Sequence, residues 1–495
     1  MKGKRLVLLV LVLLLAAMPV LGEENEAEEE TVSREEAYAS AYRHAIAENV
    51  YVCDMNDLAH VYLEKAPHED VAMASTTKIM TCMLALEHCE LDEIVKVDRE
   101  AASLGGTNSL MGLVSGEEIT VEELLYGLML PSGNDAALAL AIHIGGSVEE
   151  FVVLMNRRAQ ELGLYETAFT NPSGVARDGH YSTAYDMAKL TRFAMGNETF
   201  RTIVSTAKHT VPANGRRKVK LELTNRNRLI SSNPKSSTYY EYAIGVKTGT
   251  TWKGSNLIAA AQKEDVVLIC VQLGAVKGED DAYRARRLAE NAKEIFEYVF
   301  NYEYGYAEAS ELITQPIAYE VLVENYRITD EKEGWLTLQA DISGAKAFRP
   351  LYEIEALRQG GAVFETNFIV EEAEAPIAAG QKLGTVELSY KNRVWFTCPL
   401  IASRSVEVFT EADLSTPTPA PTDTPAPTEA PGDTLEDTPA PAATPTAAPP
   451  IQAAMTHDPL LLVLAGLGAL LGILLLVCGG LLLKGKRKGG VPKEK

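Results

Sequence analysis

Apolar and polar positions along the central part of the chain follow two different periods. Apolar residues that recur every three or four positions are typical of amphipathic helices. This spacing predicts helices at 34–46, 79–86, 148–162, 185–195 and 281–300. Runs that alternate between apolar and polar residues, or that are apolar throughout, are typical of strands. Such runs predict a hairpin at 47–63 and strands at 244–250, 257–262 and 266–274.

Two segments rich in turn-forming residues interrupt the helical part. Pro131-Ser132-Gly133-Asn134 separates two apolar helices within 117–144, and a loop rich in Gly, Pro, Asn and Asp occupies 170–182. The late strands follow one another as hairpins. Helices that interleave with such strands predict an α+β domain, in which helices pack on an antiparallel sheet, and we expect this domain at 33–303.

Beyond residue 306 the pattern changes to short alternating runs separated by glycines. Runs such as 320–323 and 335–338 are typical of short strands. The change predicts a second, small all-β domain at 305–410. Its sequence contains no grouping of Ser, His and Asp that suggests catalysis.

The N-terminal end of the chain has the pattern of an export signal. Basic residues precede an apolar run at 6–21, and small residues follow near Gly22. This arrangement predicts a secretory signal peptide at 1–22, with an uncleaved anchor as the alternative. The glutamate-rich segment 23–32 predicts a disordered acidic leader.

A second apolar run, 459–483, lies near the other end and contains no charged residue. At about 1.5 Å of rise per residue it spans roughly 37 Å as a helix, which is enough to cross a bilayer. The basic segment 484–495 follows, and positive charge stays on the cytoplasmic side. We expect a transmembrane helix rather than a sortase signal, because 455–458 lacks an L-P-x-T-G-like motif.

The segment that precedes this run, 411–458, is dominated by Pro, Thr and Ala. A segment of this composition cannot bury a core and forms an extended, semi-rigid spacer. Together with the signal peptide, these features predict a single-pass protein of the cell membrane. Its globular part is expected on the outer face of the cytoplasmic membrane.

Charge and cysteine content narrow the classes of function. The formal net charge is −22, which argues against nucleic-acid binding because nucleic acids require a basic surface. The five cysteines outside the apolar runs have no regular spacing, and neither C-x-x-C nor H-x-x-x-H is present. We therefore expect free thiols, no metal site and no cofactor.

The candidate chemistry begins at Ser75-Thr76-Thr77-Lys78, where an apolar helix is predicted to start. Positions i and i+3 share a helix face, so one element can hold the Ser75 hydroxyl beside the Lys78 amine. A serine hydroxyl is a weak nucleophile until a base takes its proton, and lysine can be that base when burial or a second cation lowers its pKa. On its own, this four-residue pattern is common by chance.

Two further motifs give the pattern its weight. Ser132-Gly133-Asn134 lies in the turn between helices, and Lys247-Thr248-Gly249 lies in a predicted strand. The three motifs in this order are typical of penicillin-binding proteins and class A β-lactamases. The chain most resembles the D-alanyl-D-alanine carboxypeptidases among the low-molecular-mass penicillin-binding proteins, serine peptidase family S11. The segments that carry the resemblance are 74–81, 130–137, 155–163, 169–174, 182–188, 225–227 and 245–251.

The resemblance covers 33–300 strongly and 305–410 more weakly. It implies that Ser75 attacks the carbonyl of a D-Ala-D-Ala bond at the end of a peptidoglycan stem peptide, with Lys78 as the base. Ser132 passes the proton to the leaving amine, and the backbone N–H groups of Ser75 and Thr250 form the oxyanion hole. β-Lactams resemble the D-Ala-D-Ala terminus and are expected to acylate the same serine.

The same resemblance implies which residues bind the substrate. They are Asn134, Arg226, Lys247, Thr248 and Gly249. Lys247 is also the cation expected to lower the pKa of Lys78. His180, in the 170–182 loop, is expected either to line the cleft or to lie in a surface loop. One departure concerns anchoring, since many family members end in an amphipathic helix and this chain has a spacer and an apolar span.

Three other functions compete with this interpretation. A β-lactamase shares the fold and the nucleophile, but the deacylation motif E-x-x-L-N of class A enzymes is not found, and a secreted scavenger needs no membrane span. A DD-endopeptidase that cuts cross-links would carry the same motifs. A catalytically idle wall-binding protein would not need all three motifs intact, and failure to bind labelled penicillin would favour it.

Overall fold

The computed structural model describes residues 32–105, 109–251, 254–276, 280–360 and 363–411. The predicted signal peptide, nearly all of the predicted spacer, the predicted transmembrane helix and the basic tail lie outside these residues. Within the described ranges, no single helix is long and apolar enough to cross a bilayer. One bent pair, Asn134–Gly145 with Val148–Glu161, meets the test of length and composition, with an angle of 86° between its helices.

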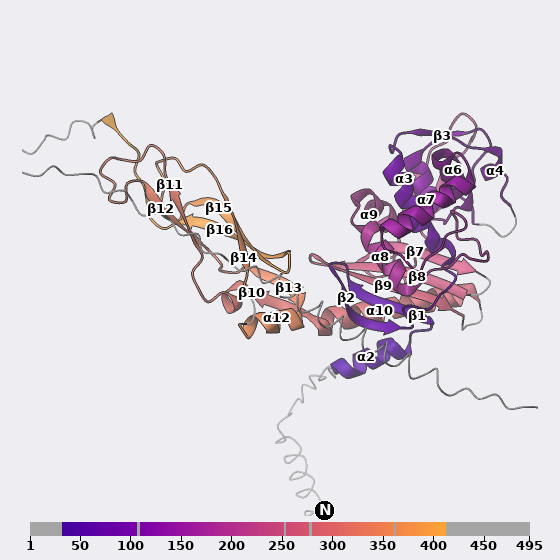
Figure 1. Ribbon diagram of the computed structural model, residues 1–495, viewed down its shortest axis with the longest axis horizontal. Helices are drawn as coiled ribbons and strands as arrows, with labels where there is room; N and C mark the ends of the chain where they lie inside the picture. The colour runs from indigo at the N-terminus through magenta and orange to yellow at the C-terminus, as the bar shows by residue number, and fades with distance from the viewer. Residues whose placement is uncertain (1–31, 106–108, 252–253, 277–279, 361–362, 412–495) are drawn as a thin grey trace, which may run out of the picture. The chain divides into compact units, whose positions relative to one another are not determined.

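A five-stranded antiparallel sheet lies at the centre of the N-terminal part, in the strand order β2-β1-β9-β8-β7 (Figure 1). Its strands are β1 (Asn49–Asp54), β2 (Asp57–Lys65), β7 (Ala243–Thr251), β8 (Gly254–Lys263) and β9 (Val266–Ala275). Strand β1 pairs with β2, its neighbour in sequence, and on its other edge with β9, where Asn49 lies opposite Leu273. The predicted strands are therefore confirmed, and so is their antiparallel arrangement.

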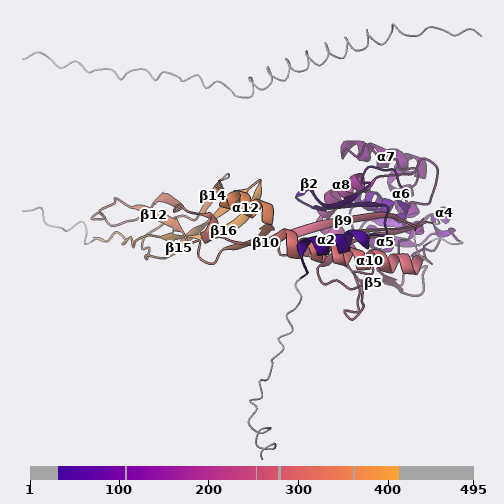
Figure 2. The same cartoon turned by 90° about the horizontal axis from the view of Figure 1, so that it is seen from below.

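Both faces of this sheet are buried under helices. Because side chains of a strand alternate between faces, Tyr51 and Cys53 of β1 join one core and Val50 and Val52 join the other. Figure 2 shows α7 and α8 on one side of β9, with α2 and α10 on the other side. Burial on both faces explains why β9, and residues 257–261 of β8, are nearly continuous apolar runs in the sequence.

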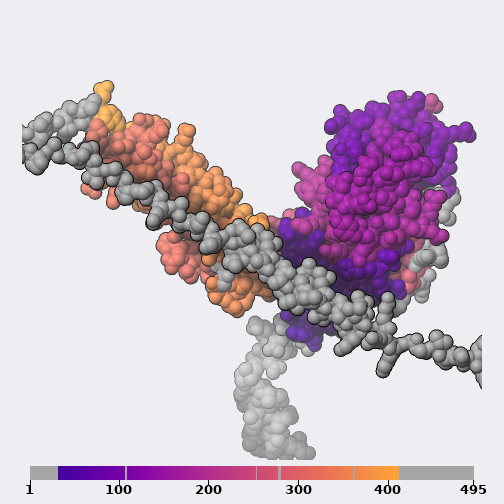
Figure 3. Space-filling view, in the orientation of Figure 1, coloured from indigo at the N-terminus to yellow at the C-terminus, as the bar shows by residue number. Residues whose placement is uncertain are grey.

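Helices from the middle of the chain form most of the larger core. They are α3 (Lys78–His88), α4 (Arg99–Ala102), α5 (Val121–Met129), α6 (Asn134–Gly145), α7 (Val148–Glu161), α8 (Ala184–Met195) and α9 (Glu198–Ser205). The second face carries α2 (Arg34–Arg43) and α10 (Asp281–Tyr298), which continues into a π-helical turn, η2 (Val299–Glu303). Two short hairpins complete this part: β3 (Ile94–Lys96) with β4 (Glu118–Thr120), and β5 (Lys208–Val211) with β6 (Leu221–Thr224). In the space-filling view, the indigo-to-magenta residues form one continuous surface (Figure 3).

The helix predicted at Ser75 differs from the observed one at its first turn. Residues Ala74–Thr77 form a 3₁₀ turn, η1, and the α-helix α3 begins only at Lys78. Helix α9 was not predicted, although Asn197 caps it and Phe200, Ile203 and Val204 are buried along one face. Its eight residues are fewer than the window in which helical spacing becomes distinctive.

A second five-stranded antiparallel sheet, in the order β11-β12-β16-β15-β14, forms the C-terminal part. Its strands are β11 (Ala318–Leu322), β12 (Trp335–Ala340), β14 (Glu365–Val370), β15 (Lys382–Tyr390) and β16 (Arg393–Ala402). A two-stranded sheet pairs β10 (Tyr304–Glu308) with β13 (Lys346–Pro350). The short helices are α11 (Ala309–Leu312) and α12 (Leu351–Arg358).

The prediction that this second part is all-β was wrong at α12. The helix buries Ile354 and Leu357, which lie three positions apart and so share one helix face. A single buried pair at helical spacing does not stand out among short alternating runs. The sheet itself agrees with the predicted strand pattern at 320–323 and 335–338.

Candidate active site

Ser75 lies in the tight η1 turn, immediately before α3. The buried Thr77 hydroxyl stabilises this turn by donating a hydrogen bond to the Ala74 carbonyl oxygen at 2.8 Å. In the resulting geometry, Lys78 Nζ lies 3.0 Å from Ser75 Oγ. The three-residue spacing therefore brings the two groups together as predicted, through a 3₁₀ turn rather than through an α-helix.

The Lys78 amine is surrounded by oxygen atoms from three parts of the chain. Besides Ser75 Oγ, Nζ lies 2.8 Å from Asn134 Oδ1 and 2.7 Å from the Ser173 carbonyl oxygen. A neutral amine has two N–H donors and one lone pair. Because a carboxamide oxygen and a backbone carbonyl can only accept, the two donors point to Asn134 and Ser173. The lone pair is then free to accept the proton of Ser75.

Burial favours the neutral form of the Lys78 amine. The side chain is 0% exposed, and desolvation lowers the pKa of Lys78 well below its ordinary value. The positive charges of Lys247 and Arg226 lower the pKa further, while Asp135 opposes them. The predicted influence of Lys247 is thus present, but burial is the larger cause.

Lys247 forms a second buried cation on the other side of the turn. Its side chain is 1% exposed, and its Nζ donates to the Thr248 carbonyl oxygen at 3.1 Å. Burial, together with the charge of Arg226, lowers the pKa of Lys247 to about 7. Among the residues that the structure describes, Lys247 has no ion-pair partner. An anion that entered the site would raise this pKa and hold Lys247 in its charged form.

Two glycines allow the backbone to pack closely against the nucleophilic turn, Gly249 from strand β7 and Gly174 from the 170–182 loop. A Cβ atom on Gly249 would lie 3.0 Å from the Met73 carbonyl oxygen and 3.2 Å from the Ser75 nitrogen. This approach brings the backbone of Gly249, and of Thr250 after it, alongside Ser75. From the opposite side, Gly174 has φ +83°, and its Cβ would lie 1.8 Å from the carbonyl oxygen of Ala74, so no side chain fits there.

The Ser132-Gly133-Asn134 turn is held in a strained conformation at the start of α6. Ser132 has φ +66°, which is rare for a residue with a side chain. Its side chain is 3% exposed, and Ser132 Oγ has no hydrogen-bond partner among the described residues. A buried hydroxyl without a partner costs free energy unless a ligand completes its hydrogen bonds. The third residue of the motif, Asn134, accepts a hydrogen bond from Lys78 Nζ.

The predicted substrate-binding residues Arg226 and Thr248 lie at the edge of the site. The Arg226 side chain is exposed, and its Nη1 donates to Ser109 Oγ at 2.8 Å. The Arg226 backbone N–H donates to the Leu130 carbonyl oxygen at 3.1 Å, which ties this residue to the end of α5. Thr248 is half-buried on β7, next to Lys247.

Two residues that order the site were not predicted. Asn171 Oδ1 accepts hydrogen bonds from the backbone nitrogens of Ser173, Gly174 and Val175, and so shapes the turn that presents the Ser173 carbonyl to Lys78. Asp135, directly after Asn134, accepts from three successive backbone N–H groups, those of 111, 112 and 113. The sequence signals were an Asn-Pro-Ser-Gly turn and an acidic residue in the first turn of a buried helix.

Within the described ranges the cysteines are free, and one trio of side chains brings possible metal ligands together. Cys53, Cys82, Cys89, Cys270 and Cys398 are free thiols there, as expected. One group of side chains, Cys89, Glu93 and His143, has candidate ligand atoms within 4.8 Å of one another. His143 Nε2 lies 2.7 Å from Glu93 Oε1, so a hydrogen-bonded pair accounts for most of this group.

Comparison with known proteins identifies the family. The family model of D-alanyl-D-alanine carboxypeptidase, peptidase S11, matches residues 36–277. D-alanyl-D-alanine carboxypeptidase DacD of Salmonella typhimurium is 31% identical over 351 residues, which cover 68% of this chain and 81% of DacD. The chain belongs to the S11 D-alanyl-D-alanine carboxypeptidases. DacF of Bacillus subtilis is 40% identical over 225 residues, which cover 44% of this chain and 55% of DacF.

Two solved structures are also similar to this S11 carboxypeptidase. DacD from Francisella tularensis is 22% identical, with a TM-score of 0.47, and the match covers 73% of this chain and 94% of that one. The Streptomyces K15 DD-transpeptidase is 32% identical, with a TM-score of 0.47, and the match covers 52% and 97% respectively.

His180 stabilises the nucleophilic turn of this carboxypeptidase from the 170–182 loop. It is buried and lines a cavity beside Ser75, so the cleft alternative holds rather than the surface one. The Thr170 backbone N–H donates to His180 Nδ1 at 3.0 Å, which leaves the ring hydrogen on Nε2. Nε2, 2.8 Å from Thr77 Oγ1, then donates to that hydroxyl.

We expect this buried histidine to make the fold sensitive to acid. Burial lowers the pKa of His180 to about 4, below its ordinary value of about 6.5. The neutral form therefore contributes stability that is complete above pH 6.5 and is lost as the pH falls through about 4. Between pH 7 and pH 4 the free energy of unfolding should fall by about 3 kcal/mol through this residue. Urea unfolding curves recorded at the two pH values measure the difference.

His180→Gln is the matched control for this effect, because a glutamine amide can still donate to Thr77 but does not titrate. The variant should lose less stability between pH 7 and pH 4 than the wild type does. Equal losses in both proteins would show that His180 is not the group responsible.

Proposed function

We propose that this protein is a serine-type D-Ala-D-Ala carboxypeptidase that removes the terminal D-Ala from peptidoglycan stem pentapeptides. One observation carries the proposal: Lys78 Nζ is buried, has a lowered pKa, and lies 3.0 Å from Ser75 Oγ, with Asn134 Oδ1 and the Ser173 carbonyl oxygen also in hydrogen-bond range. A serine next to a neutral, oriented amine is an activated nucleophile. Membership in the S11 family names the bond that it attacks.

Acylation begins when Ser75 Oγ attacks the carbonyl carbon of the penultimate D-Ala. An O–C bond forms, and the hydroxyl proton passes to the lone pair of Lys78. The negative charge on the carbonyl oxygen is stabilised by the backbone N–H groups of Ser75 and Thr250, which the close passage of Gly249 brings together. Each such donor contributes about 3 kcal/mol to the stability of the transition state.

The C–N bond then breaks, and D-Ala leaves once its nitrogen has gained a proton. We assign to Ser132 the transfer of that proton from Lys78, since its buried hydroxyl has no hydrogen-bond partner among the described residues and is available for the substrate. Water next attacks the acyl carbon: a new C–O bond forms, the bond to Ser75 Oγ breaks, Oγ takes back a proton from Lys78, and the shortened peptide leaves with the new carboxylate. Lys78, which lies 3.0 Å from the esterified oxygen, is the base in position to take the proton of that water.

The free carboxylate of the substrate is bound by the cations at the end of the cleft. Lys247 is buried and without an ion-pair partner in the described structure, Arg226 is near enough for its charge to lower the pKa of Lys247, and Thr248 follows Lys247 on β7. Asn134 binds the substrate backbone, and Gly249 allows it to pair with β7. A carboxylate at this point also keeps Lys247 charged.

Anchoring and location are also proposed. A signal peptide at 1–22 exports the chain, a Pro/Thr-rich spacer at 411–458 extends from the globular part, and a helix at 459–483 crosses the membrane with 484–495 inside. The enzyme then acts on the outer face of the cytoplasmic membrane. The apolar runs, the basic tail and the proline content of the sequence support this arrangement.

The proposed function is tested by two measurements on the same protein. We expect release of D-alanine from a peptide that ends in D-Ala-D-Ala, and a labelled penicillin that stays attached to the protein. A β-lactamase would lose the label rapidly. Retention of the label without any release of D-alanine would contradict the carboxypeptidase assignment.

Arg226→Gln is expected to weaken recognition of the terminal carboxylate. Hydrogen bonds to charged groups contribute about 1.5 to 3 kcal/mol, so kcat/KM for the free-acid peptide should fall roughly tenfold to a hundredfold. The same peptide with an amidated terminus is already a poor substrate and should change little. An equal loss for both peptides would show that Arg226 does not bind the carboxylate. Arg228→Gln, at a nearby exposed arginine, is the matched control.

A further inference from the structure

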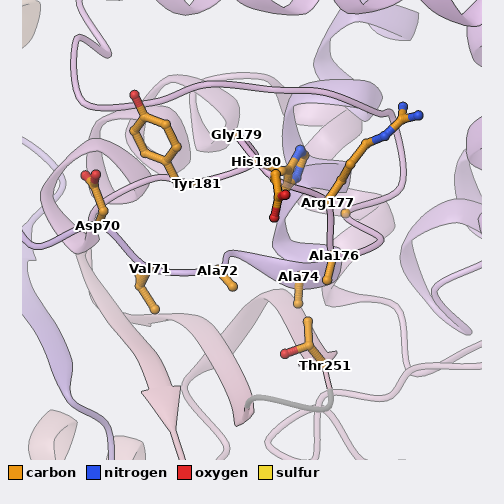
Figure 4. Close-up of a pocket in the computed structure, with 12 residues that line it drawn as sticks. Asp70, Val71, Ala72, Ala74, Ala176, Arg177, Gly179, His180, Tyr181 and Thr251 are labelled. Carbon is orange, nitrogen blue, oxygen red and sulfur yellow. The ribbon is translucent and has the colours of Figure 1, made fainter.

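Three side chains that the catalytic reaction does not use gather at the C-terminal ends of α3 and α6. They are Cys89, Glu93 and His143, and their candidate ligand atoms all lie within 4.8 Å of one another. Within this trio, His143 Nε2 lies 2.7 Å from Glu93 Oε1. None of the three is among the described residues that line the cavity beside the nucleophilic turn, which Figure 4 shows with His180 and Tyr181. The trio is therefore separate from the active site.

Two helices connect this trio to the catalytic centre. Lys78 and Asn134 are the first residues of α3 and α6. At the other ends of the same helices, Cys89 is the C-cap of α3 and His143 lies in the last turn of α6. Helix α6 contacts both α3 and β3, the strand that begins directly after Glu93, and Figure 1 shows these elements at one end of the N-terminal part. At about 1.5 Å of rise per residue, α3 places the trio roughly 16 Å from the catalytic lysine.

We propose that Cys89, Glu93 and His143 bind one zinc ion, with a water molecule as the fourth ligand. Thiolate sulfur, imidazole nitrogen and carboxylate oxygen are the ligand types that zinc takes in proteins, in tetrahedral geometry. The ion joins the end of α3, the residue before β3 and the last turn of α6. It therefore stabilises the two helices that begin at Lys78 and Asn134. No step of the proposed reaction involves the trio, so the inference does not rest on the proposed function.

The charges around the trio favour a cation. The C-terminal end of a helix carries a partial negative charge, and the ends of α3 and α6 both contribute a member of the trio. The Glu93 carboxylate adds a full negative charge, and no lysine or arginine among the described residues forms an ion pair with it. When zinc binds, the Cys89 thiol releases its proton to the solvent. Thiolate and carboxylate then neutralise the two positive charges of the ion.

The spacing and exposure of the three side chains suit an ion that enters from solvent. Zinc bonds of about 2.0 to 2.3 Å in tetrahedral geometry place neighbouring ligand atoms about 3.3 to 3.6 Å apart. The trio spans this range, with 2.7 Å between His143 and Glu93 and at most 4.8 Å between any two ligand atoms. The side chains of His143 and Glu93 are 26% and 41% exposed, and Cys89 is half-buried. Small rotations of exposed side chains therefore complete the geometry.

Two other His–Glu pairs show what the thiol adds. His44 Nδ1 lies 2.9 Å from Glu294 Oε2. His68 Nδ1 lies 2.8 Å from Glu166 Oε2. Neither pair belongs to a group of three candidate ligands among the described residues. A hydrogen bond explains those two pairs in full, whereas here Cys89 supplies a third ligand. The expectation of no metal site rested on C-x-x-C and H-x-x-x-H, and positions 89, 93 and 143 follow neither spacing.

The first test measures binding of Zn²⁺ alone to the full-length chain in detergent micelles, after EDTA has removed any metal. We expect one ion per chain, with a dissociation constant below about 1 µM. Cys89→Ser and His143→Gln should each weaken binding at least about tenfold. His44→Gln, in a His–Glu pair without a thiol, is the matched control and should bind zinc like the wild type. Labelled penicillin confirms that each variant is folded.

The second test locates the ion at the thiol. Iodoacetamide alkylates the thiolate, so bound zinc should slow the modification of Cys89, which mass spectrometry follows residue by residue. This protection should occur in the wild type and in His44→Gln, and should be lost in His143→Gln. Added zinc should also raise the melting temperature of the wild type but not that of Cys89→Ser.

Two results would overturn the inference. One is a wild-type chain that binds no zinc at micromolar concentration. The other is zinc binding that stays unchanged in both Cys89→Ser and His143→Gln, which would indicate adventitious binding elsewhere. Release of D-alanine is measured on the same samples, at the distant catalytic centre. Absence of release would contradict the proposed function and leave the zinc result standing, so the two hypotheses can fail separately.

Discussion

Replacement of Ser75 by alanine is expected to abolish both D-alanine release and covalent attachment of penicillin. The side chain sits in a 3₁₀ turn 3.0 Å from the Lys78 amine, and no acyl-enzyme can form without its oxygen. Loss of the nucleophile in a serine peptidase lowers kcat by about 10⁶-fold. We therefore expect kcat/KM for a D-Ala-D-Ala peptide to fall at least about 10⁴-fold, to the limit of detection.

The Ser75→Ala variant should remain folded, since the change removes one half-buried oxygen and leaves the turn bonded through Thr77. Its melting temperature should lie within a few degrees of the wild type. Ser205→Ala, at an exposed serine of α9, is the matched control and should keep full activity. Persistent labelling of a folded Ser75→Ala protein would show that another residue is acylated.

Replacement of Lys78 by methionine is expected to slow acylation by about a thousandfold while Ser75 stays in place. A positioned general base contributes about 10² to 10⁴-fold, and methionine has a similar length but no basic nitrogen. The second-order rate of attachment of labelled penicillin measures this step alone. The change also leaves Asn134 Oδ1 and the Ser173 carbonyl without their donor, so stability should fall by about 1 to 3 kcal/mol.

Lys78→Arg separates the loss of the base from the loss of those hydrogen bonds. A guanidinium keeps its donors but stays protonated, because its pKa exceeds about 12. The arginine variant should therefore be as slow as the methionine variant, although the permanent buried charge beside Lys247 should make it less stable. In the wild type, acylation should slow as the pH falls through the lowered pKa of Lys78, because protonation removes the lone pair. An arginine variant that acylates at the wild-type rate would refute the role of Lys78.

The pattern of apolar and polar residues was sufficient to predict the central sheet and most of the helices. Strand β9 is a nearly continuous apolar run because both of its faces are buried, and the buried residues of α7, Phe151, Met155 and Ala159, recur at helical spacing. The helix α12 escaped prediction because its buried residues are too few to show a helical period. The 3₁₀ geometry of η1 depends on tertiary contacts to Gly174 and Gly249, which local spacing does not reveal.

The three motifs were sufficient to name the groups that the structure brings together around Lys78. The Ser173 carbonyl could not be found in this way, because a backbone oxygen has no residue signature. Its position depends on the Asn171 side chain, which folds the turn. The sequence motifs also did not show that burial is the largest cause of the lowered pKa of Lys78, because the extent of burial depends on how the whole chain packs.

Strand β1 lies between β2 and β9, and this order determines when the catalytic turn can exist during folding. Asn49 pairs with Leu273, so the sheet that supports η1 closes only after a loop of more than 200 residues has been ordered. Such a high contact order makes folding slow, since the entropy of loop closure is lost before the non-local contacts form. A chain emerging from synthesis or export therefore has no reactive Ser75 until β7, β8 and β9 have followed it.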